Sequence, residues 1–157
     1  MRKTLGTIVA LIVLAILMGT FITVKSSIAG EKARDGRFIA YDNGTVLDTK
    51  TKLMWAAKDN GSNIYWQDAK SYCDNYRGGG YTDWRMPTQD ELSELYDASI
   101  TGKYNHHLTK LITLTWCCVW ASEERRGGFY ADFDFIKGVR RSASFNSRRA
   151  LPVRSSK

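Results

Sequence analysis

The chain begins with a long apolar segment that follows two basic residues. Residues 4–24 contain no charged side chain, and Arg2 and Lys3 stand directly before them. Positive charge ahead of an apolar run keeps the N-terminus in the cytoplasm and sends the following residues across the membrane. The pattern therefore predicts export across the inner membrane, to the periplasm, the cell surface or the medium.

The end of this segment allows two interpretations. Ser27-Ile28-Ala29 offers small residues where a signal peptidase cuts, but an uncharged run of 21 residues also reaches the roughly 20 that span a bilayer. We predict that residues 1–29 are a signal peptide or, if uncleaved, a signal anchor that holds residues 4–24 in the membrane with the domain outside the cytoplasm. Residues 30–36 are short and polar and are predicted to be a linker. Residues 37–157 are predicted to form one folded domain.

The first part of the domain alternates short apolar runs with turn residues. Asn43-Gly44 supplies the positive φ angles of a tight hairpin turn. Strands are predicted around it, at residues 38–41, 45–48 and 53–55. Turn residues here also carry oxygens that suit Ca²⁺, but their spacing is not that of an EF-hand, so turn chemistry explains them better and we predict no cofactor. These residues are Asp42, Asn43 and Asp48.

Two helices are predicted in the middle of the domain. Apolar residues recur every three or four positions up to residue 76, which predicts a helix capped by Ser62 or Asn63 and stopped by Gly78-Gly79-Gly80. A second helix begins after Pro87, where Thr88 and Glu91 have the spacing of a capping box. The residues expected to be buried are Trp66, Ala69, Cys73 and Tyr76 in the first helix and Leu92, Leu95 and Tyr96 in the second.

The last third of the chain returns to a strand pattern. β-Branched and aromatic residues predict strands at residues 111–120, 129–135 and 150–154. Pro152 confines the last of these to an edge or a bulge. The whole pattern predicts an α+β domain with two helices packed on a small, mainly antiparallel sheet, after an N-terminal apolar targeting helix.

The positive charge of the chain is concentrated at its C-terminus. The formal net charge is +7, yet residues 30–134 hold 13 basic and 16 acidic side chains, whereas residues 135–157 hold seven basic and none acidic. Such an end could attract a polyanion. The other interpretation is a solvated basic face without a specific partner.

If the chain is exported, its three cysteines lie in a compartment where disulfides persist. Adjacent residues do not easily bridge one another, so Cys73 is expected to pair with Cys118, marginally ahead of Cys117. Three buried thiols are the alternative. The adjacent His106 and His107 give no zinc-ligand spacing together with these cysteines, so no metal site is predicted.

Several short segments together carry a resemblance to a known family. The most specific is the string GGYTDWRMPTQDEL at residues 79–92. The others are residues 43–48, 53–55, 69–73, 119–123 and 149–154. Taken in chain order, these segments resemble the Lcl C-terminal domain family, over about residues 37–154.

The resemblance implies a fold like that of C-type lectins and occurrence in bacterial envelope or secreted proteins. The adhesin that names the family binds sulfated glycosaminoglycans and has a collagen-like stalk. No Gly-X-Y repeat exists in this sequence, so trimeric, multivalent binding does not carry over.

The central string also has a scaffold interpretation. Asp83 and Arg85 are expected to tie the turn to the sheet through a charge-assisted hydrogen bond, and Trp84 to fill the core. Pro87 would start the helix that Thr88 caps, with Glu91 completing the capping box. We expect this motif to hold the fold rather than contact a ligand.

Catalysis has no support in the sequence. The two histidines are adjacent, and neither a nucleophile elbow nor a metalloprotease helix is present. No catalytic residue is predicted, and the chain is expected not to be an enzyme.

Binding of a sulfated or anionic glycan, in adhesion, is the leading hypothesis. Its candidate residues supply guanidinium and ammonium groups for anions and aromatic rings for sugar faces. They are Arg125, Arg126, Lys137, Arg140, Arg141, Arg148, Arg149, Phe129, Tyr130 and Phe145. The alternative is a structural envelope component whose domain binds another protein. Nucleic acid is not an expected partner, because export separates the protein from the usual nucleic-acid targets.

Overall fold

The computed structural model describes residues 29–144 and 148–156. The predicted targeting segment and the candidate ligand residue Phe145 lie outside these residues. Among the described residues, no helix has the length and the apolar character needed to cross a membrane.

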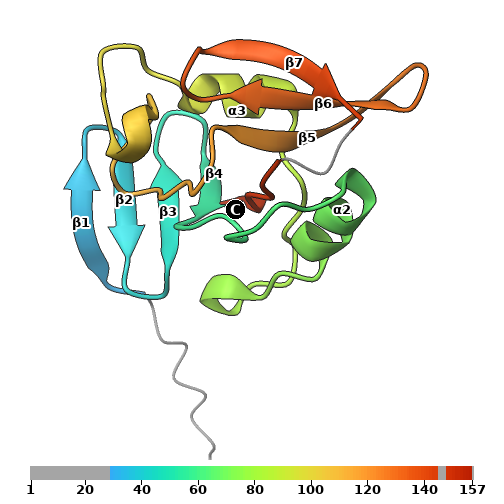
Figure 1. Ribbon diagram of the computed structural model, residues 1–157. Helices are drawn as coiled ribbons and strands as arrows, with labels where there is room; N and C mark the ends of the chain where they lie inside the picture. The colour runs from blue at the N-terminus through green and yellow to red at the C-terminus, as the bar shows by residue number, and fades with distance from the viewer. Residues whose placement is uncertain (1–28, 145–147, 157) are drawn as a thin grey trace, which may run out of the picture.

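A five-stranded antiparallel sheet forms one side of the domain (Figure 1). Its strands are β1 (Glu31–Asp35), β2 (Phe38–Tyr41), β3 (Thr45–Asp48), β4 (Leu53–Ala56) and β8 (Val153–Ser155), in the order β1-β2-β3-β4-β8. The three strands expected around the Asn-Gly turn are confirmed. The linker prediction for residues 30–36 is wrong, because most of these residues form the edge strand β1. Its exposed side chains give no apolar alternation, and only backbone pairing with β2 identifies the strand.

A second, three-stranded antiparallel sheet contains β5 (Cys118–Arg125), β6 (Phe129–Asp134) and β7 (Val139–Ala143) in sequence order. The strand predicted at residues 129–135 is confirmed, whereas the one predicted at 111–120 begins only at Cys118. Strand β7 was not predicted, since most of its side chains are polar and at least partly exposed. The last predicted strand starts after Pro152, at Val153.

The two predicted helices are present, as α2 (Trp66–Asp74) and α3 (Gln89–Leu95). The first starts later than expected, and its N-cap Tyr65 makes no side-chain capping bond. Its residues Trp66, Ala69 and Cys73 are buried as predicted. The Thr88 to Glu91 capping box of α3 is confirmed. Short 3₁₀ turns follow at η1 (Gly78–Gly80) and η2 (Lys103–Asn105).

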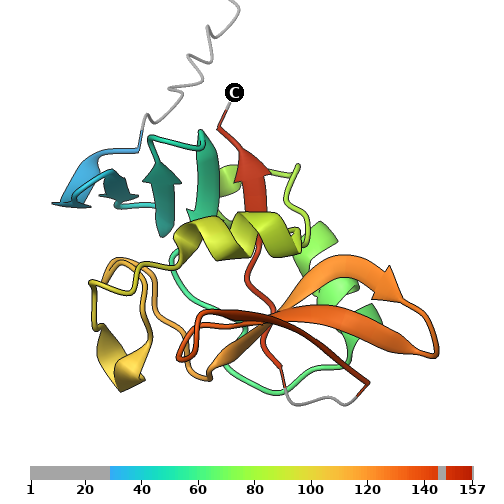
Figure 2. The same cartoon turned by 90° about the horizontal axis from the view of Figure 1, so that it is seen from above.

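Two groups of buried residues hold the layers together. The larger joins both sheets through α3, which lies between them in Figure 2. It includes Val46, Trp55, Leu92, Leu95, Phe133, Phe135 and Leu151. The smaller packs α2 against the three-stranded sheet and includes Trp66, Cys73, Met86 and Trp120. Two helices and two antiparallel sheets confirm the α+β class.

The central motif uses different partners from those expected. The Asp83 carboxylate accepts hydrogen bonds from Arg154 at 2.6 and 3.0 Å. Arg85 instead donates to Glu91 at 2.8 and 2.5 Å. The predicted bond between Asp83 and Arg85 is therefore wrong: Asp83 binds Arg154, which is distant in the sequence, and Arg85 binds Glu91 in the helix that follows. Trp84 is buried, as predicted.

Candidate functional site

The structure separates the exposed basic residues predicted from the sequence. Arg125, Arg126 and Phe129 lie at the β5–β6 hairpin, whereas Lys137 and Arg140 lie at the turn into β7 and on β7 itself. These two places are at opposite ends of β6. They do not form one binding site. Arg125 also donates to the Gln89 amide oxygen at 2.9 Å, and Arg140 pairs with Asp90.

Arg148 lies inside the domain, not on a basic surface. It is 8% exposed, and its Nε lies 3.0 Å from the carboxylate of Asp132, which is fully buried. Arg141 completes the group: its Nε is 3.4 Å from Asp132, and its Nη1 is 2.9 Å from Asp134. Burial raises the pKa of Asp132, and the charge of Arg148 opposes that rise. The surface position expected for Arg148 is therefore corrected to an internal ion pair.

Arg149 is a second buried arginine, and it anchors the segment before β5. Its Nε donates to Thr115 Oγ1 at 2.7 Å and lies 3.8 Å from Asp59, and its Nη1 donates to Asn63. Asp59 in turn accepts from the Thr115 backbone N–H at 2.6 Å. The surface position expected for Arg149 is also corrected to a buried one, because its guanidinium binds side chains of the domain itself.

Tyr130 is also engaged within the domain. Its ring stacks on that of Trp66 with centroids 4.4 Å apart and an interplanar angle of 14°. Its hydroxyl accepts a hydrogen bond from Gln67 at 2.7 Å. One face of this ring is thus taken by Trp66 and is not offered to a sugar.

The disulfide expected between Cys73 and Cys118 is wrong, because Cys117 and Cys118 are bonded to each other. Cys73 is a free thiol with no exposed surface, and burial raises its pKa. The prediction assumed a strand through residue 117, in which neighbouring side chains point to opposite faces. Residues 115–117 form a bend instead, which allows both sulfurs to meet.

A pocket of about 310 Å³ opens beside this disulfide. We call it the disulfide pocket. Its surroundings are mainly apolar, with Trp116 50%, Tyr104 59% and Ile136 42% exposed. It is lined by Tyr104, His106, Thr115, Trp116, Cys117 and Ile136.

Backbone structure places the two aromatic rings at this pocket. Trp116 lies in the bend between Thr115, which Arg149 anchors, and Cys117, whose carbonyl accepts from the Phe135 N–H at 2.8 Å. Tyr104 lies in η2 with a φ of 60°. Such a left-handed angle is uncommon for a bulky residue and costs free energy. Tyr104 thus lies at the pocket edge with its side chain largely exposed.

The pocket lining carries no charged side chain at pH 7, but groups of both signs lie close to it, since an Asp134 oxygen is within 4.8 Å of the Cys117 sulfur and Lys103 adjoins Tyr104. The Lys103 ammonium lies 4.8 Å from the centroid of the Tyr104 ring, and the exposed Lys137 follows Ile136 in sequence. His106 is buried, and burial lowers its pKa, so its ring is neutral at pH 7. The prediction from the sequence included Lys137 but missed Tyr104 and Trp116. The one feature that could have indicated them is the position of Trp116 directly before two adjacent cysteines.

One group of metal-type ligands exists within the described ranges. The Cys117 and Cys118 sulfurs and an Asp134 oxygen lie within 4.8 Å of one another. The sulfurs are bonded together, and Asp134 binds Arg141 and accepts from the backbone N–H groups of residues 136 and 137. The geometry thus offers no thiolate ligand while the disulfide is formed.

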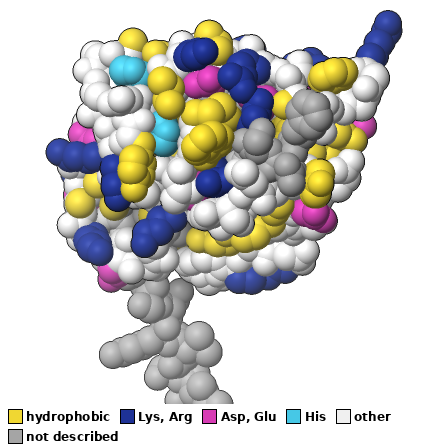
Figure 3. Space-filling model, viewed as in Figure 1, with side chains coloured by type: hydrophobic (Ala, Val, Ile, Leu, Met, Phe, Trp, Pro, Cys, Tyr) yellow, Lys and Arg dark blue, Asp and Glu magenta, His cyan; other side chains and the backbone are white. Residues whose placement is uncertain are grey.

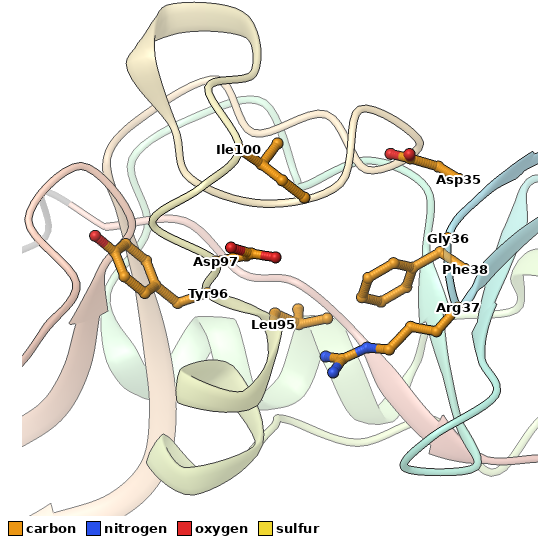
Figure 4. A pocket seen from close by; sticks show the side chains of 8 residues that line it. All are labelled: Asp35, Gly36, Arg37, Phe38, Leu95, Tyr96, Asp97 and Ile100. Atoms are coloured by element: carbon orange, nitrogen blue, oxygen red, sulfur yellow. The ribbon is translucent and has the colours of Figure 1, made fainter.

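A second pocket, of about 250 Å³, lies between β2 and the end of α3 (Figure 4). It is lined by Asp35, Gly36, Arg37, Phe38, Leu95, Tyr96, Asp97 and Ile100. Its charged groups already have partners: Arg37 pairs with Asp48 at 3.1 Å, Asp35 accepts from Thr109, and Asp97 accepts from Ser99. These charged groups are therefore engaged within the protein and are not offered to a ligand.

The comparison with protein families assigns the chain. The model of the Lcl C-terminal domain matches residues 44–154, and the chain belongs to this family. Membership indicates a module like those of bacterial surface adhesins, and the family is not a known enzyme family. No curated protein and no solved structure matches the chain.

Proposed function

We propose that this chain is an exported adhesion module that binds an anionic, sulfated polysaccharide at the disulfide pocket, outside the cytoplasm. The observation that carries the proposal is the exposure of Trp116 and Tyr104 around one pocket, with the Lys103 ammonium 4.8 Å from the centroid of the Tyr104 ring. Family membership supports the adhesin class. The predicted targeting segment supports export, as a cleaved signal peptide or as an anchor.

The chemistry of the pocket suits the two faces of such a ligand. Exposed indole and phenol rings present flat apolar surfaces on which the C–H face of a sugar ring packs. Lys103 and Lys137 provide ammonium groups for sulfate or carboxylate at the edge of that ring. Figure 3 shows apolar and basic side chains gathered close together on one face of the molecule, which favours the same kind of ligand.

An envelope protein is the alternative partner. Ile136 and Val139, 42% and 41% exposed, extend the apolar surface beside the pocket along the turn into β7. Exposed apolar surface of this kind also marks protein interfaces. Salt separates the two functions, because polyanion binding weakens as ionic strength rises and an apolar protein interface does so much less.

Replacing Trp116 tests the proposed function. Loss of one stacking ring is expected to weaken binding to a heparin oligosaccharide about tenfold in Trp116→Ala. Tyr65→Ala is the matched control, since Tyr65 is an equally exposed aromatic residue, at 58%, outside the pocket. Titration of both variants of the full chain at several salt concentrations measures the effect. Equal affinity of the two variants would contradict the assignment of the pocket.

A further inference from the structure

The Cys117–Cys118 disulfide forms part of the disulfide pocket and adjoins the bend that carries Trp116. We propose that this disulfide is a redox switch of the binding site: reduction releases the bend, moves Trp116 and weakens ligand binding. The inference rests on the proposed function and adds its regulation.

The disulfide holds a local conformation that a strand would not keep. Neighbouring side chains of a strand project to opposite faces, but the bond holds the sulfurs of Cys117 and of Cys118, the first residue of β5, together. The carbonyls of Cys117 and Cys118 accept backbone hydrogen bonds from Phe135 at 2.8 Å and Arg149 at 2.9 Å. The first bond aligns residue 117 with the end of β6, and the second joins residue 118 to Arg149. Once the sulfurs separate, β5 can extend backwards and carry Trp116 out of the pocket.

Access to the two sulfurs is unequal. Cys117 is half-buried and lines the pocket, whereas Cys118 has no exposed surface. An external thiolate therefore reaches the Cys117 sulfur first. The pocket is the entry for the reductant, so a bound ligand also protects the disulfide.

The exchange needs a dithiol reductant and proceeds in two steps. A thiolate of the reductant forms a mixed disulfide with Cys117, and Cys118 leaves as a thiolate that takes up a proton. The second thiol of the reductant then attacks its own sulfur in the mixed disulfide and frees the Cys117 thiol. Two electrons and two protons pass to the cysteine pair, and the reductant becomes a disulfide.

Cys73 does not take part in this exchange. Its side chain has no exposed surface, and burial raises its pKa, so the thiol stays protonated and out of reach. Thiolates, not thiols, carry out disulfide exchange. The pair at positions 117 and 118 is therefore the only redox couple among the three cysteines, and Cys73→Ser is a matched control.

The experiment compares heparin-oligosaccharide binding by the full chain in its oxidised state and after treatment with dithiothreitol. Mass spectrometry after alkylation identifies the state at each cysteine. Affinity is expected to fall about tenfold on reduction, the value of one lost stacking ring, and to return on reoxidation. Cys117→Ser/Cys118→Ser should bind like the reduced protein, and Cys73→Ser like the oxidised protein.

Two further outcomes are decisive. Unchanged affinity with positions 117 and 118 both alkylated would overturn the switch and leave the proposed function intact. If neither state binds heparin, the proposed function fails, and the switch is judged on the fluorescence of Trp116, taken as the difference between the unaltered protein and Trp116→Phe. A shift of the emission maximum in this difference spectrum on reduction supports the switch, and an unshifted maximum refutes it, because loss of quenching by the disulfide changes the intensity alone.

Discussion

Replacing Arg148 with Met is expected to lower the free energy of unfolding by about 3–5 kcal/mol, the usual cost of leaving a buried charge without its partner. Asp132 is fully buried and, among the described residues, would keep the more distant Arg141, whose Nε is 3.4 Å away. Urea denaturation measures the loss. Arg126→Met is the matched control, because Arg126 is exposed on the β5–β6 hairpin, and it should change stability by no more than about 0.5 kcal/mol.

The destabilisation by Arg148→Met should depend on pH in a defined direction. Burial raises the pKa of Asp132 above its ordinary value of 3.8, and Arg148 limits that rise. A raised folded-state pKa makes stability fall as pH rises from the unfolded pKa through the folded one. Removing Arg148 raises the folded pKa further, so the loss should be full at neutral pH and nearly absent below 3.8, where Asp132 is protonated in both states. A loss that grows on acidification would contradict the buried pair.

Replacing Arg149 with Met should affect both stability and binding. The variant loses a charge-assisted hydrogen bond to Thr115 and another to Asn63, and about 1.5–3 kcal/mol of stability is expected to go with them. Asp59 keeps backbone donors at Thr115 and Gly61, so the loss should be smaller than that of Arg148→Met. Because Thr115 directly precedes Trp116, heparin affinity should fall as well.

The salt dependence of binding separates this indirect role of Arg149 from direct contact with a sulfate. A lost contact to the ligand would reduce the dependence of affinity on salt and leave stability unchanged. A displaced Trp116 would weaken binding at every salt concentration and accompany a loss of stability. The structure predicts the second result, and the first would restore Arg149 as a binding residue.

Features that depend on neighbouring residues could be predicted from the sequence. The Asn43-Gly44 hairpin and the Thr88 to Glu91 capping box are set by backbone angles and hydrogen bonds within a few residues. The buried face of α2 follows from apolar spacing, which the structure confirms at Trp66, Ala69 and Cys73.

Features that depend on distant partners could not be predicted from the sequence. Strand β1 owes its identity to backbone pairing, so its polar sequence resembled a linker. Arg148 and Arg149 looked like surface charge until the fold brought Asp132 and Asp59 to them. The vicinal disulfide escaped prediction because residues 115–117 have the β-branched and aromatic residues of a strand but form a bend.

The central claim, a glycan-binding site at the disulfide pocket, is tested most directly by NMR of the indole N–H groups. Trp116 is the exposed member of the five tryptophans, so its signal should move and saturate when heparin oligosaccharide is added to the full chain. The signals of the buried Trp55, Trp66, Trp84 and Trp120 should move little. A Trp116 signal that stays in place while heparin binds would contradict the account.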